Sequence, residues 1–132
     1  MKKYYFILFC VELMVAIGAI PAGYAYIKDP SGTGLGVTVE LLANSPLKDF
    51  LIPGLFLLIV NGFCQLTGAV FSILNKPVAG KIGLILGFVL MVWIVIQVIW
   101  IGLSSFMQPL FFFVGLFEMA LGWTIIRKQA GY

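Results

Sequence analysis

Residues 109–127 read PLFFFVGLFEMALGWTIIR, an apolar run of membrane-spanning length with one acidic residue, Glu118, near its middle. Gly115, Glu118 and Gly122 are spaced i, i+3 and i+7, so a helix places all three on one face. A carboxyl group between glycines suits a helix face that packs against other helices and not against lipid. The rest of the chain therefore has to supply the helices that cover this face.

The composition excludes a soluble domain. Of the 132 residues, 62% are hydrophobic and only 10% are charged, which is too little polar surface to cover a soluble fold. The chain lacks histidine, the commonest metal ligand and acid/base group, and we predict no catalytic residue, metal site or cofactor. Cys10 and Cys64 lie in apolar runs, and we expect small buried side chains rather than a disulfide.

Four apolar stretches predict an all-α fold, an integral membrane four-helix bundle in a single domain over residues 1–132. The first stretch follows Lys2 and Lys3 as a signal peptide would, but its length and the interruption at Glu12 favour an uncleaved span. In the loop after it, residues 37–43 are expected to form a short interfacial helix or a re-entrant segment. The predicted spans are 4–27, 50–74, 82–103 and 109–126.

The distribution of basic residues predicts the topology. With the N-terminus inside, six basic residues are cytoplasmic and two, Lys28 and Lys48, lie outside. This bias places both termini in the cytoplasm of a multi-pass protein, and a bacterial inner membrane is the expected location. The six inner residues are Lys2, Lys3, Lys76, Lys81, Arg127 and Lys128.

Three polar residues from three spans are predicted to share one layer. Glu12 lies nine residues after Lys3, and Glu118 lies nine before Arg127, so each is ~13 Å from the inner face. Gln65 lies at a similar depth in the second span, at ~15 Å. The spans contain no basic side chain to pair with a carboxylate, so desolvation favours the neutral acid, and two adjacent carboxyls would share a proton.

The sequence supports two interpretations of this layer. Glu12, Glu118 and Gln65 are candidates for a proton, cation or ligand site, because intramembrane carboxyls are usually functional. Alternatively, a protonated Glu bonded to Gln65 or to a backbone carbonyl holds the bundle together. A second, outer polar layer of Asn61, Gln97 and Trp93 is expected to serve hydrogen bonding between helices, with the lining of a ligand site as the alternative. Trp93 needs a packing partner.

The second span also carries a polar and small-residue stripe. Asn61, Gln65, Gly68 and Ser72 recur at i, i+4, i+7 and i+11, and such a stripe normally faces other helices. In the third span, Gly83 and Gly87 form a GxxxG that permits close helix approach.

The chain resembles small bacterial four-helix membrane proteins of the DoxX/DoxD-like type. The resemblance rests on the four short spans, on the segment NGFCQLTGAVF in the second and on FFFVGLFEMALGW in the fourth. It implies an association with quinone-linked redox chemistry. The chain is also similar to small multidrug resistance transporters, which have four helices and one membrane-embedded glutamate in the first; Glu12 matches that proton- and cation-binding position.

These observations leave three functions open. The favoured one is a non-enzymatic accessory or assembly subunit, whose polar faces lock the bundle or dock a larger membrane partner. The others are a proton-coupled carrier or binding protein for a small hydrophobic or cationic molecule, and a membrane subunit of a quinone-linked oxidoreductase. The predicted partners are the lipid bilayer and either a larger membrane protein or further copies of the chain, and no nucleic acid.

Overall fold

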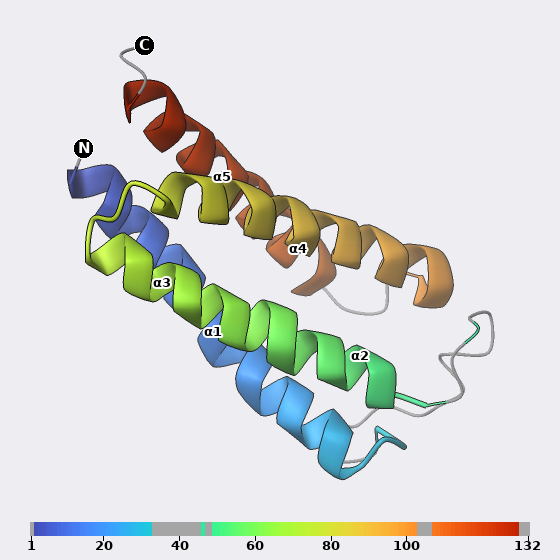
Figure 1. Cartoon of the computed structure of the whole chain (residues 1–132). Coiled ribbons are helices and arrows are strands. Elements are labelled where there is room, and N and C mark those ends of the chain that lie inside the picture. Colours follow the sequence, from blue (N-terminus) through green and yellow to red (C-terminus); the bar gives the residue numbers. More distant parts are fainter. Residues whose placement is uncertain (1, 33–45, 47–48, 103–106, 130–132) are drawn as a thin grey trace.

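The computed structural model describes residues 2–32, 46, 49–102 and 107–129, which form an all-α structure (Figure 1). The segment between α2 and α3 continues them without a break, so the described residues form four long helices, each long and apolar enough to cross a membrane. This confirms the predicted all-α class. The elements are α1 (Lys2–Lys28), α2 (Leu51–Phe56), the π-helical segment η3 (Leu57–Cys64), α3 (Gln65–Ile73), α4 (Ala79–Ile101) and α5 (Met107–Gln129).

The last two helices begin earlier than the sequence predicted. The amide of Ala79 donates to the carbonyl of Lys76 at 3.0 Å, which starts α4 there and places Lys81 in its first turn instead of in the loop. α5 begins at Met107, so Pro109 lies in the first turn. Proline is tolerated there because the first amides of a helix have no acceptor within it. The interfacial segment predicted at 37–43 lies outside the described residues.

A turn with the geometry of a Schellman motif ends α3. Asn75 has a positive φ of 56°, and its amide donates to the carbonyl of Ser72 at 3.0 Å. The next amide, of Lys76, donates to the carbonyl of Phe71 at 3.0 Å. Asparagine tolerates this left-handed conformation, and Pro77 follows because it cannot continue a helix. The turn at residues 75–77 therefore ends the helix close to residue 74, where the second predicted span ends, and connects α3 directly to α4.

The helices form two hairpins, α1 with α2–η3–α3 and α4 with α5 (Figure 1). Glycines allow the backbones in each hairpin to approach closely. A Cβ atom added at Gly87 of α4 would lie 2.6 Å from the carbonyl oxygen of Gly115 of α5, and one added at Gly122 would lie 2.6 Å from that of Gly80. Gly115 and Gly122 thus pack against a neighbouring helix, as the sequence predicted.

Both glycines of the GxxxG in α4 permit close helix approach, as predicted, but they contact different helices. Gly87 packs against α5, but Gly83 faces α1, where an added Cβ would lie 2.9 Å from a methyl carbon of Leu8. The close contact between α4 and α5 uses Gly80 and Gly87 instead, which are seven residues apart. Two glycines four residues apart share a face only approximately, and here each contacts a different helix.

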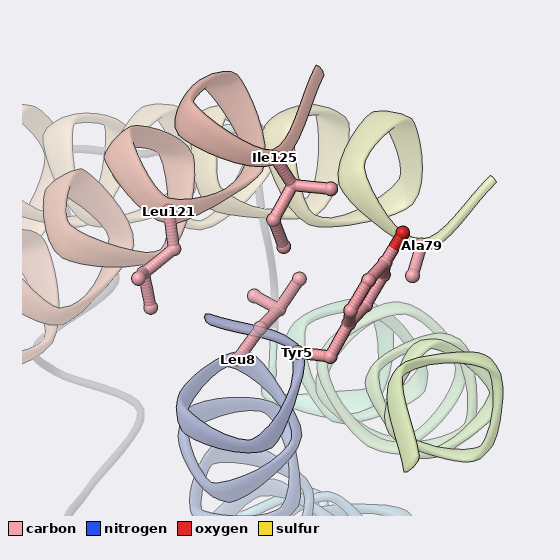
Figure 2. Packing of buried hydrophobic residues seen from close by; sticks show 5 residues of the cluster. All are labelled: Tyr5, Leu8, Ala79, Leu121 and Ile125. Atoms are coloured by element: carbon pink, nitrogen blue, oxygen red, sulfur yellow. The ribbon is translucent and has the colours of Figure 1, made fainter. Parts of the chain in front are cut away.

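The two hairpins meet at the end of the bundle that carries both chain termini, here called the terminal end; the opposite end, where α1 finishes and α2 begins, is the loop end (Figure 1). An apolar cluster joins the hairpins at the terminal end. Figure 2 shows its side chains from α1, α4 and α5 pointing toward one another. The terminal cluster consists of Tyr5, Leu8, Ala79, Leu121 and Ile125.

The outer surface is apolar. Large side chains such as Ile17, Ile85, Ile99 and Phe113 are more than half exposed, as expected for helices that contact lipid. The cysteines Cys10 and Cys64 are free and lie on this surface too, so the prediction that they are buried was wrong. In an apolar span a cysteine can face either lipid or protein, because both environments suit a small apolar side chain.

Candidate functional site

The side chain of Glu118 lies inside the bundle and bonds to another helix. Its exposed fraction is 0%, and its Oε1 accepts a hydrogen bond of 3.0 Å from Nε2 of Gln65. The glycines on either side of Glu118 bring α5 against α4, and this orientation directs the carboxyl group toward α3. Glu118 therefore links the two hairpins across the interior.

Glu12 is also 0% exposed, and it bonds to α3 two turns after Gln65. Its Oε1 accepts a hydrogen bond of 2.7 Å from Oγ of Ser72, and its carboxyl group lies against Gly68, where an added Cβ would overlap Oε2. Gln65, Gly68 and Ser72 thus form one face of α3 that receives both carboxyl groups. The absence of a side chain at Gly68 makes room for the first of them.

Both carboxyl groups lie against the same face of α3, that of Glu118 at Gln65 and that of Glu12 at Gly68 and Ser72, so each lies in the electric field of the other when both are charged. The second oxygen of each, Oε2, is buried without a hydrogen-bond partner among the described residues, as is Oε1 of Gln65. These three oxygens are hydrogen-bond acceptors when the acids are ionised. We call Glu12, Gln65, Ser72 and Glu118 the carboxyl layer.

The described part of the spans places its basic side chains near the helix ends. Lys2, Lys3, Lys81, Arg127 and Lys128 lie in the terminal turns of their helices, and Lys28 ends α1. An ionised carboxylate in this layer therefore lacks a buried countercharge, which is a costly arrangement in an apolar bundle. A proton or a bound cation relieves this cost. Across the described residues, no group of three His, Cys, Asp or Glu is suited to hold a metal ion.

The predicted layer of Glu12, Glu118 and Gln65 is thus brought together in the structure. The sequence analysis missed the role of Ser72 as the hydrogen-bond donor to Glu12. The signal was present, because Ser72 stands on the same polar stripe as Gln65, seven residues later. The stripe itself faces other helices as expected, since Asn61, Gln65 and Ser72 are all at most 2% exposed.

The predicted outer layer is divided in two. Gln97 accepts a hydrogen bond of 3.3 Å from Nε2 of Gln108, which lies between the predicted third and fourth spans but is buried in α5. Trp93 stacks on Phe56 of α2, with ring centroids 4.5 Å apart, which is the packing partner it was expected to need. Neither residue hydrogen-bonds to Asn61, a residue of η3, in the described part of the chain.

Asn61 differs from Gln97, the other amide of the predicted outer layer, in having no hydrogen-bond partner for its side chain among the described residues. It is 2% exposed, and both polar atoms of its side chain lack a hydrogen-bond partner within the described ranges. It also lies within η3, and π-helical segments occur frequently at functional sites. The sequence did not predict this segment, because a π-helix and an α-helix have the same hydrophobic composition.

Comparisons with protein-family models, with curated proteins and with solved structures find no match to this chain. The candidate site therefore has to be interpreted from its own residues.

Proposed function

We propose that the chain is a small membrane protein that binds a proton, or a cation in its place, at the carboxyl layer, and that it acts as a proton-coupled carrier or binding protein. Its ligand would be a small hydrophobic or cationic molecule. The observation that carries the proposal is the pair of fully buried glutamates, each with one unpartnered oxygen and without a buried basic neighbour in the described spans.

Two ionised carboxylates on the same face of α3 in this interior would repel each other and would lack a countercharge among the described residues. The pair therefore retains at least one proton or binds a cation. Because the two acids lie on α1 and α5, in different hairpins, a change in their charge changes the interaction between the hairpins. Exchange of the proton for a cationic ligand is thus coupled to how the hairpins pack, which is the coupling that a carrier requires.

The location follows from the four apolar helices and the charges at their ends. We propose a multi-pass protein of a bacterial inner membrane with the terminal end in the cytoplasm. The terminal end carries Lys2, Lys3, Lys76, Arg127 and Lys128, and a bias of this kind favours the cytoplasmic side.

Purified protein in nanodiscs tests the proposal. A lipophilic cation, tetraphenylphosphonium, is added to weakly buffered protein, and proton release is followed with a pH indicator dye. We expect release from the wild type and none from the double variant Glu12→Gln/Glu118→Gln, because neither amide has an acidic proton to exchange. Thr67→Val is the matched control, since Thr67 is exposed on α3 and its hydroxyl bonds only within its own helix in the described contacts. Release that persists in the double variant would refute the site.

The alternative is an accessory subunit in which the carboxyl layer is a structural clamp. The cross-helix hydrogen bonds from Gln65 and Ser72 favour it, because each already satisfies one carboxyl oxygen. The layer is buried within the chain's own bundle, so it can lock the helices but cannot itself dock a partner. Native mass measurement separates the two functions: a stoichiometric larger partner together with no proton release supports the clamp, and a monomer or homodimer with release supports the carrier.

A further inference from the structure

Polar side chains continue from the carboxyl layer toward the loop end. Asn61 precedes Gln65 by four residues on the same continuous helix, which places it about one turn, or ~6 Å, nearer the loop end. Phe56 lies five residues before Asn61, about one further turn where the backbone bonds run from i to i+5. Its stacking on Trp93 sets that indole at the same level. From the carboxyl layer outward, the order is therefore Gln65, Asn61 and Trp93.

These outer polar groups are buried without protein partners. Both side-chain polar atoms of Asn61 and the Nε1 of Trp93 make no hydrogen bond to the described residues. Buried amides and indoles in proteins are almost always bonded, and internal water is the usual partner where protein groups are lacking. An amide that donates and accepts at once can continue a hydrogen-bonded chain in both directions.

The terminal side of the carboxyl layer is different. Leu8 lies one turn from Glu12, Leu121 lies one turn from Glu118, and both belong to the apolar terminal cluster (Figure 2). The hydroxyl of Tyr5 in that cluster already accepts a hydrogen bond of 2.6 Å from Nε2 of Gln129. Unpartnered buried polar atoms in the described structure occur at the carboxyl layer and on its loop side, and none occurs on its terminal side.

We infer that the carboxyl layer exchanges protons with the loop end of the bundle through Asn61, while the terminal cluster blocks exchange at the other end. This inference rests on the proposed function, since it requires an exchangeable proton on Glu12 or Glu118. The titratable groups around the path are few. Apart from these acids, Tyr5 belongs to the terminal cluster, and Tyr26 stacks on Phe50 at the loop end.

The test is hydrogen–deuterium exchange of the protonated carboxyl group, followed by its infrared C=O band after the protein in nanodiscs is transferred to D₂O. We expect Asn61→Leu to slow the shift of this band roughly tenfold, the factor for the loss of one buried hydrogen bond. Asn61→Ser keeps a small hydrogen-bonding side chain and should restore most of the rate. Trp93→Phe is the second variant, for the case that Asn61→Leu does not fold. It keeps the ring contact with Phe56 but removes the indole N–H, so it should also slow the exchange.

Gln129→Leu is the matched control on the terminal side, because it removes a polar contact to the terminal cluster and leaves Asn61 intact. Its exchange rate should equal that of the wild type. An Asn61→Leu rate equal to the wild type, with the carboxyl band present, would overturn the access path alone. Slower exchange in Gln129→Leu would also overturn it. The glutamine variants identify the infrared band of the protonated Glu12 or Glu118, because they lack it. If the wild type shows no such band, the proposed function is refuted.

Discussion

Replacement of Gly68 by alanine tests the packing of the carboxyl layer most directly. The added methyl group would overlap Oε2 of Glu12 and would lie 3.0 Å from Cδ of the same side chain and 3.1 Å from a methyl carbon of Ile82. The Glu12 side chain has to move, and we expect this movement to break its hydrogen bond with Ser72. The variant tests whether the absence of a side chain at position 68 is what allows the carboxyl group to lie against α3.

The expected cost has two parts. Overpacking a close-packed interior costs about 1–3 kcal/mol, and loss of a buried hydrogen bond adds about 1 kcal/mol. Alanine in place of glycine in a helix stabilises the folded state by up to about 1 kcal/mol, which offsets part of this cost. Gly18→Ala is the matched control for this gain, because Gly18 is exposed on α1 and its added Cβ would meet only a ring atom of Phe111, at 3.9 Å. Gly68→Ala should therefore be about 2–4 kcal/mol less stable than Gly18→Ala.

The free energy of unfolding is measured in mixed micelles by titration with a denaturing detergent, followed by far-UV circular dichroism. A double-mutant cycle with Glu12→Ala identifies the contact responsible, because Gly68→Ala should cost much less once the carboxyl group is gone. Equal stability of Gly68→Ala and Gly18→Ala would refute the reasoning. A cost for Gly68→Ala that is unchanged in the Glu12→Ala background would assign the overlap to a different neighbour.

Three further substitutions probe the helix contacts. Gly87→Ala places a methyl carbon 2.6 Å from two backbone atoms of α5, which cannot move away as a side chain can, so we expect a loss of at least about 3 kcal/mol in the same unfolding assay. Ser72→Ala leaves the carboxyl group of Glu12 without its donor and should cost about 1–3 kcal/mol, while Ser72→Thr, which keeps the hydroxyl, should cost less. Phe56→Ala removes the ring that stacks on Trp93. In a background where Trp93 is the only tryptophan, its fluorescence emission should shift to the red, because the indole loses its apolar partner.

The sequence by itself determined the class of the molecule and the existence of its four apolar helices. Backbone polar groups in lipid must be bonded within a helix or a closed barrel, and apolar stretches of about 20 residues have the length that a helix needs. The turn at residues 75–77 and the burial of Glu12, Gln65 and Glu118 were also predictable, the turn from local chemistry and the burial from the high cost of placing a polar side chain in lipid. The DoxX-like resemblance and the placement of the termini in the cytoplasm remain predictions.

Only the tertiary structure decided which groups meet. Helical spacing places Gly83 and Gly87 on roughly the same face. In the structure, however, Gly80 and Gly87 contact α5, and Gly83 contacts α1. Spacing likewise marked Ser72 as inward-facing without naming Glu12 as its partner. The π-helical segment around Asn61 was not visible in the sequence, because it changes the hydrogen-bond register and not the composition. Partners depend on the rotation and crossing of whole helices, which are set by packing among all four and not by any single stretch of sequence.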